Sequence, residues 1–136
     1  MTPAPIVLDT NIVLDVFVFS DAATTPLKAG LIDGSLDWLA TAPMRVELAR
    51  VLGYPQIVPR LAFYRLSAED VLAFFDRYVR LVGVAPKASV TCSDTDDQCF
   101  IDLAVAHKAR LLSKDKAVIS MKKRLLAHDV IACSAI

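Results

Sequence analysis

Residues 5–15 read PIVLDTNIVLD, and this stretch sets a carboxylate directly after a short apolar run. We predict that residues 5–8 form a strand buried on both faces, as central strands of parallel sheets are. Asp9 follows at once, and a carboxylate this close to a buried strand must accept hydrogen bonds, bind a cation or take up a proton. Which of these three conditions applies to Asp9 decides most of what the sequence says about function.

The segment after Asp9 admits two local structures. Residues 12–19 are rich in Val and Phe, which favours a strand by propensity alone. A strand here would need a turn at Thr10 and Asn11, and neither Gly nor Pro is present to form one. We therefore predict a buried helix that begins at Thr10 or Asn11.

The chain of 136 residues has the length of one domain, and we take residues 1–136 as a single unit. It is 55% hydrophobic with a mean hydropathy of +0.49, enough to bury a substantial core. Asp9, Asp15 and Asp21 interrupt the apolar stretches well short of the roughly 20 residues that span a bilayer. The first cationic side chain is Lys28, so no basic leader is expected, and the cysteines form no CxxC pair. These features predict a cytoplasmic protein that does not enter a membrane.

Charge is balanced overall, with 15 basic and 15 acidic residues, but it is unevenly distributed. Before Arg45 the chain has five aspartates and one lysine, whereas residues 108–124 hold seven basic residues and one aspartate. The basic run fits either a solvated helix face or a rim that contacts phosphates beside an acidic pocket.

Strand-like segments alternate with helix-like segments along the chain. Pro43 and Gly53 mark the start and end of a helix that Thr41 caps, and Ser67 with Asp70 forms a capping box before another helix. This alternation predicts an α/β fold in which helices cover both faces of a parallel sheet. The expected strands are residues 5–8, 36–40, 81–85, 111–113 and 130–133; the expected helices are residues 12–19, 22–33, 42–52, 71–79, 96–108 and 121–127, with a short helix within 54–66.

Two aspartates fall where ligands bind in open α/β sheets, beyond the carboxyl ends of strands. Asp9 follows the strand of residues 5–8, and Asp115 follows residues 111–113 after one residue. Each aspartate also fits a helix N-cap, a position that favours this residue type. Their equivalent places favour a shared role, while capping stays open as the alternative.

Glu47 is a third acid that points toward the same region. It lies on the flank of the apolar stripe of the helix at residues 42–52. The alternative interpretation is a surface ion pair with Arg50, three residues further along this helix.

The fourth acid, Asp97, lies in the motif CSDTDDQCFIDLAVAH, residues 92–107. If its helix packs on the sheet, Asp97 reaches the same end of the sheet as Asp9 and Asp115. Acids are favoured at a helix start, and Thr95 with Gln98 would make a capping box, so a structural role is the alternative. Three acids within four residues nevertheless repel one another unless a positive charge is nearby; they are Asp94, Asp96 and Asp97.

Carboxylates that converge on one rim cannot all stay ionised without a cation. Oxygen ligands select Mg²⁺ or Mn²⁺ over zinc, and His107 and His128 are not spaced as a metal pair. Divalent ions in such a cluster suit phosphodiester hydrolysis, because they activate water and stabilise the charge on phosphorus. We therefore predict a Mg²⁺ or Mn²⁺ site formed by Asp9, Glu47, Asp97 and Asp115.

These motifs resemble those of PIN-domain nucleases over nearly the whole chain. The likeness rests on IVLDTNIVL, on MRVELARVL with a following YPQ, and on DTDDQCFIDLAVAHKARLLSKDKAVISM, and it is greatest to the VapC-type toxin ribonucleases. The resemblance implies a three-layer α/β/α sandwich with a central parallel sheet, and Mg²⁺- or Mn²⁺-dependent cleavage of single-stranded RNA. It also implies homodimers and an inhibitory antitoxin protein. The four acids of the family pattern correspond to Asp9, Glu47, Asp97 and Asp115.

A role for each polar residue follows from this chemistry. We expect the four acids to be catalytic and to bind the metal, and Asn11 and Ser113 to orient them as hydrogen-bond donors. Lys114 and Lys116 are expected to hold the RNA backbone. Asp15, Asp94 and Asp96 receive no role from the sequence.

Other classes of function stay open at this point. A non-catalytic PIN-like module would bind RNA or a protein partner without cutting, although the presence of all four acids argues against it. A haloacid-dehalogenase-type phosphatase needs Asp-x-Asp, and here Asn11 takes the last position. Neither a GxGxxG motif nor a P-loop is present, which argues against a nucleotide-binding enzyme.

Overall fold

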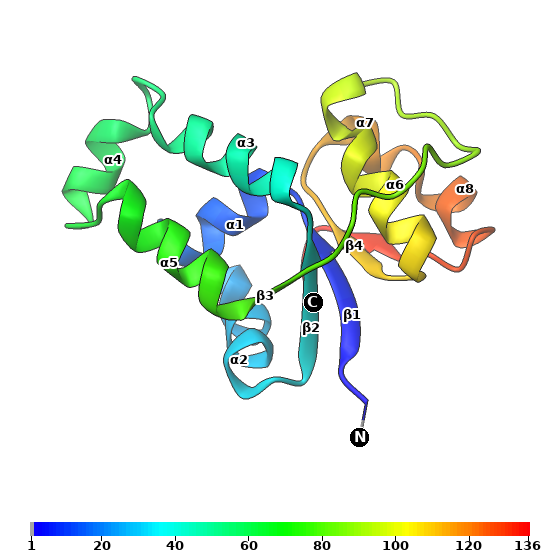
Figure 1. Cartoon of the computed structure of the whole chain (residues 1–136), viewed down its shortest axis with the longest axis horizontal. Coiled ribbons are helices and arrows are strands. Elements are labelled where there is room, and N and C mark those ends of the chain that lie inside the picture. The colour runs from blue at the N-terminus through cyan, green and yellow to red at the C-terminus, as the bar shows by residue number, and fades with distance from the viewer. Residues whose placement is uncertain (1) are drawn as a thin grey trace.

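Five parallel strands form the centre of the molecule in the order β3-β2-β1-β4-β5 (Figure 1). The computed structural model describes residues 2–136. Ile6 aligns with Trp38 on one side and with Arg110 on the other, so β1 is paired along both edges. The predicted parallel sheet is confirmed. Its strands are β1 (Ala4–Leu8), β2 (Leu36–Ala40), β3 (Val79–Leu81), β4 (Arg110–Leu112) and β5 (Ala132–Cys133).

Helices cover both faces of this sheet, which gives the predicted three-layer α/β/α sandwich. Figure 1 shows α1 to α5 on one side of the sheet and α6 to α8 on the other. The chain runs from β1 outward to β2 and β3, and then crosses to β4 and β5 beyond the opposite edge of β1. Because connections between parallel strands keep one hand, this change of direction moves the later helices to the other face. The helices are α1 (Thr10–Phe17), α2 (Thr25–Asp33), α3 (Ala42–Leu52), α4 (Val58–Phe63), α5 (Ala68–Tyr78), α6 (Gln98–His107), α7 (Lys116–Ile119) and α8 (Lys122–Leu126), with 3₁₀ turns η1 (Ala22–Thr24) and η2 (Thr95–Asp97).

The first strand and helix form as the sequence predicts. Residues 6–8 are buried, and α1 begins at Thr10 with every residue from Ile12 to Phe17 buried. Local signals also place two later helices correctly. Gly53 ends α3, and Ser67 forms the predicted capping box at the start of α5.

The third strand begins two residues earlier than the sequence predicts and is shorter. It spans Val79–Leu81, directly after α5, rather than residues 81–85. The neighbouring strand β2 ends at Ala40, whose carbonyl accepts a hydrogen bond from the Val82 amide at 2.9 Å. Beyond that bond β2 has no further backbone to pair, so residues 83–85 run on outside the sheet.

The carboxyl-terminal part also differs from the prediction in detail. The helix predicted at residues 121–127 is present as α8, and a short helix that was not predicted, α7, precedes it because Asp115 caps helical structure that starts at Lys116. The last strand covers only the end of the predicted segment 130–133. The β4 ladder extends one residue past its last assigned position, since the Ser113 amide donates to the Cys133 carbonyl at 3.0 Å.

The strand order fixes where a ligand can bind. The order in which strands are added to the sheet reverses between β1 and β4. After β1 the chain adds β2 and β3 on one side, and β4 is then added on the other side of β1. At such a switch point the connections diverge to opposite faces and leave a crevice beyond the carboxyl ends of the strands. Leu8 and Leu112 end the two strands there, and the predicted acids Asp9 and Asp115 follow them.

An aromatic cluster fills the core between the sheet and the helices α1 and α5. Trp38 of β2 is 1% exposed, its ring centroid lies 5.9 Å from that of Phe17, and Phe75 packs edge-on against it at 5.4 Å. This packing anchors the helices of one face to the sheet. Across residues 2–136, every helix is either too short or too polar to cross a membrane.

A candidate metal centre

Asp9 is a buried carboxylate that accepts hydrogen bonds from two other residues. Its Oδ1 accepts the Ile12 amide at 3.0 Å and caps α1, and its Oδ2 accepts the hydroxyl of Ser113. Burial, the largest influence, raises the pKa of Asp9, and the hydrogen bonds from Ser113 and Ile12 act in the opposite direction. Asp9 is therefore the helix cap that the sequence offered as one alternative, and its carboxylate is also tied to the end of β4 through Ser113.

Ser113 joins the ends of the two strands at the switch point. It is fully buried directly after β4, and its Oγ donates to Asp9 and accepts from the Asp115 amide at 3.0 Å. The hydroxyl thereby fixes Asp9 and Asp115 relative to each other, which is the contact that the predicted orienting role of Ser113 requires. Asn11 differs, because within residues 2–136 its exposed side chain donates no hydrogen bond to an acid of this cluster.

Three carboxylates come within reach of a single ion. One oxygen each of Asp94, Asp97 and Asp115 lies within 4.8 Å of the others. Two of these residues are also caps: Asp94 accepts from the Asp96 amide and Asp115 from the Ala117 amide, both at 2.9 Å. Capping aims one oxygen of a carboxylate at the backbone and leaves the second free for a ligand.

Asp97 supplies the test of whether a cation fits. Its Oδ2 is buried and accepts no hydrogen bond, an arrangement that is costly for a carboxylate unless a proton or a cation is bound. Burial and then the adjacent Asp115 carboxylate raise the pKa of Asp97 to about 7, with smaller contributions from Asp94 and Asp9. A divalent cation would relieve both the repulsion and the unmet oxygen, so the residues present fit such an ion.

Asp94 is the residue of this cluster that the sequence did not assign. The crowding of acids in residues 94–97 was the available signal, but the predicted Thr95–Gln98 capping box is wrong because Asp94 caps η2. Gln98 instead binds the preceding segment: its amide group accepts from the Cys92 amide at 2.6 Å and donates to the Val90 carbonyl at 3.0 Å. These bonds hold the chain that leads into Asp94.

Glu47 lies beside the cluster, across a shared cavity. It lies on α3 and lines, with Asp9 and Asp97, a cavity of about 270 Å³. Its carboxylate also forms the ion pair with Arg50 that the sequence offered as the alternative. The four predicted acids thus surround one end of the sheet, and Glu47 is held at the edge of the group by a cation of its own helix.

The basic residues beside the cluster have distinct surroundings. Lys114 forms an ion pair with Asp15, which is only 7% exposed, so both belong to the structure around the site. Lys116 is exposed, and together with Lys114 and Lys122 it lines a cavity of about 520 Å³. The two lysines predicted to contact RNA, Lys114 and Lys116, therefore lie on either side of Asp115 in the chain and line the same cavity.

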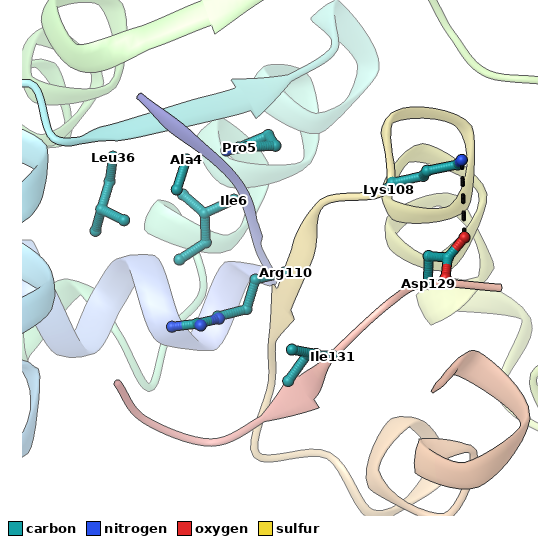
Figure 2. A pocket seen from close by; sticks show the side chains of 8 residues that line it. All are labelled: Ala4, Pro5, Ile6, Leu36, Lys108, Arg110, Asp129 and Ile131. Atoms are coloured by element: carbon teal, nitrogen blue, oxygen red, sulfur yellow. Dashed lines mark ion pairs between the residues drawn. The ribbon is translucent and has the colours of Figure 1, made fainter. Parts of the chain in front are cut away.

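A separate cavity lies at the amino ends of the strands. It measures about 220 Å³, and the exposed ion pair between Lys108 and Asp129, 3.7 Å long, crosses its rim (Figure 2). Ile6, Leu36 and Ile131 make its walls largely apolar. Its lining holds a single carboxylate, Asp129, which is paired with Lys108, so this cavity lacks the ligands of a metal site.

Comparisons with known proteins bear on the family and the fold. The family model described as "PIN domain" matches residues 5–117. No curated protein matches the chain. Among solved structures the chain is similar to a chain of the crystal structure of VapBC2 from Rickettsia felis bound to a DNA fragment from their promoter. The TM-score is 0.62 at 13% sequence identity, and the match covers 94% of this chain and 96% of that chain, which is a likeness in fold.

Proposed function

The chain belongs to the PIN domain family, and we propose that it is an endoribonuclease that uses Mg²⁺ or Mn²⁺ to cut single-stranded RNA. The observation that supports this most directly is the carboxylate cluster, with three oxygens within 4.8 Å of one another and an unpartnered buried oxygen on Asp97. Hard oxygen ligands of this kind bind Mg²⁺ and Mn²⁺ in preference to softer metals.

We assign metal binding to the acids at the crevice. Asp94, Asp97 and Asp115 would hold one ion directly, and Asp9 and Glu47 extend the acidic wall toward the adjoining cavity. When bound, the ion supplies an activated water and stabilises negative charge on the phosphate. Asp94 enters this set on geometry, beside the four acids that the sequence motif predicts.

Other residues of the chain would position the carboxylates and bind the RNA backbone. Ser113 donates to the Asp9 carboxylate and accepts from the Asp115 backbone amide, so the Asp9 carboxylate is oriented, and tied to the chain at Asp115, before any ligand arrives. Lys114 and Lys116 lie beside Asp115 and would hold the sugar–phosphate backbone of the strand. Their charges offset the repulsion between RNA and an acidic site.

The biological setting is part of the same proposal. We infer that the protein is the toxin of a toxin–antitoxin pair, acts in the cytoplasm, forms a homodimer and is bound by an antitoxin. The fold likeness to VapBC2 supports this setting. The pairing of Glu47 with Arg50 favours one competing function, a PIN-like module that binds RNA or protein without cutting.

Substitution of Asp9 by asparagine tests the proposal. The new side chain still offers an oxygen to the Ile12 amide, so we expect a folded protein that has lost Mn²⁺-dependent cleavage of single-stranded RNA. Cleavage by the parent protein should stop when EDTA is added. Asp129→Asn, at the opposite end of the sheet, is the matched control and should cleave as the parent does.

The outcomes separate the two candidates. Full activity in Asp9→Asn would refute the assignment of the site. Binding of RNA without cleavage by the parent protein, over several RNA sequences with Mn²⁺ present, would establish the non-catalytic module instead.

A further inference from the structure

A cavity beside the carboxylate cluster has no role in the function proposed so far. It measures about 520 Å³ and shares Asn11, Leu14 and Ile57 with the wall of the acidic cavity, so the two adjoin. Besides Asp15 and Asp21, its remaining lining is an aromatic ring and two cations, a combination that a metal site does not need. These residues are Phe19, Arg60 and Lys114.

Phe19 and Arg60 form a platform on one wall of this cavity. The Arg60 guanidinium carbon lies 3.9 Å from the centroid of the Phe19 ring, and the Tyr64 ring packs at a tilt against Phe19 with a centroid distance of 6.2 Å. Arg60 is exposed, and among residues 2–136 it forms no ion pair with a carboxylate. A guanidinium held over an aromatic ring keeps a second face on which a planar, unpaired base can stack.

Lys114 stands where this cavity meets the lysine-lined cavity beyond it. It lines both, and its ion pair with the buried Asp15 restricts where its ammonium group can lie. The next residue in the chain is Asp115 of the cluster. A phosphate bound by Lys114 would therefore lie beside the carboxylate cluster. The base of the same nucleotide could then stack on the platform.

We propose that this cavity is a nucleotide subsite, in which Phe19 and Arg60 stack the base of a nucleotide next to the scissile phosphate and Lys114 binds its phosphate. The inference rests on the proposed nuclease function and names how that site takes its substrate. A base stacked in this way cannot be paired, so the subsite gives a physical reason for selecting single-stranded over duplex RNA. Asp21 also lines the cavity, and its negative charge disfavours a further phosphate there.

The test separates stacking from charge. Fluorescein-labelled hexa-adenylate is titrated with each protein in EDTA, so that no cleavage occurs, and binding is followed by anisotropy. Arg60→Ala should weaken binding by roughly 5- to 100-fold, the range that loss of one stacked base produces. Arg60→Lys should weaken binding nearly as much as Arg60→Ala. Its ammonium group keeps the positive charge but lacks the planar face on which a base stacks.

Arg77→Ala is the matched control. Arg77 also lies over an aromatic ring, 5.4 Å from the centroid of Tyr78, and it does not line the proposed subsite, the acidic cavity or the other two cavities at this end of the sheet. It should bind the RNA as the parent protein does. A second series moves one abasic residue along the hexamer, and one position should abolish the difference between the parent protein and Arg60→Ala.

The results decide the subsite independently of catalysis. Equal binding by the parent protein and Arg60→Ala, full binding by Arg60→Lys, or an equal loss in Arg77→Ala would overturn it, as would no binding by the parent. If Arg60 is required for binding but the parent never cleaves RNA with Mn²⁺, the nuclease proposal fails and the subsite stands. If the parent protein cleaves RNA and Arg60→Ala binds RNA as tightly as the parent, the subsite proposal fails and the nuclease proposal stands.

Discussion

Replacing Asp97 with asparagine should make the metal-free protein more stable. Burial and the neighbouring Asp115 raise the pKa of Asp97 from 3.8 to about 7, so above neutral pH the folded state holds a charge that it disfavours. A rise of this size corresponds to about 4 kcal/mol at about 1.4 kcal/mol per pH unit. Asp97 is partly exposed, and solvent screening reduces the figure to about 1–2 kcal/mol.

The sign of the pH dependence follows from proton binding. Between pH 4 and pH 7 the folded state binds the Asp97 proton more tightly than the unfolded state, so rising pH lowers the free energy of unfolding over this range. The penalty is absent below about pH 4 and complete above about pH 7. The substituted side chain is an amide that cannot ionise, and the gain from Asp97→Asn should therefore be largest at pH 8 and less than half as large at pH 5.

Thermal unfolding in EDTA at these two pH values measures the effect. A gain of about 1–2 kcal/mol corresponds to a midpoint about 3–8 °C higher for a domain of this size. Asp129→Asn is the control, because its carboxylate has one exposed ion pair, and its stability should change by less than about 0.5 kcal/mol at both pH values. Adding Mg²⁺ should then reverse the order, stabilising the parent protein and leaving Asp97→Asn unchanged.

Two results would refute this reasoning. Asp97→Asn that is no more stable than the parent at pH 8 in EDTA would show that the cluster carries no electrostatic strain. A gain of equal size at pH 5 and pH 8 would show that the stabilisation has another origin than the ionised carboxylate.

Three further substitutions probe the site and the core. Ser113→Ala should lower the free energy of unfolding by about 1–3 kcal/mol, measured by urea denaturation, because Asp9 and the Asp115 amide both lose a buried partner; its Mn²⁺ affinity by calorimetry should also fall about tenfold or more. Glu47→Gln should leave the thermal midpoint nearly unchanged, since its pair with Arg50 is exposed, while Mn²⁺-dependent RNA cleavage drops about tenfold or more. Phe75→Ala should cost about 3–5 kcal/mol by urea denaturation with Trp38 fluorescence as the probe, and a loss under about 1 kcal/mol would contradict the packing of this ring against Trp38.

The parts of the fold that the sequence predicts are those with local signals. A continuous apolar run made β1 recognisable, and Ser67 with Asp70 marked the start of α5. The third strand was misplaced because its limits depend on where its neighbour β2 ends, at Ala40, and no feature of residues 79–85 records that. Strand boundaries set by a partner are invisible to local patterns.

The candidate site shows the same division. Asp9 and Asp115 were recognisable as candidates because each comes soon after a strand, and the structure adds that both are helix caps. The position of Asp94 depends on Gln98, which holds the preceding loop through bonds to Val90 and Cys92. Contacts between residues distant in the chain, such as Lys114 with Asp15 or Arg60 with Phe19, have no sequence pattern at all.

The strand order also determines when the protein can act during its own synthesis. A ribosome releases Asp9 early, but Ser113, the partner of its carboxylate, is made 104 residues later. Until β4 inserts along the open edge of β1, a nascent chain that has folded β1 to β3 has neither Ser113 nor Asp115 in place. The proposed cleavage of RNA therefore requires that β4 and Asp115 have been made, and we expect no activity from chains that stop before Ser113.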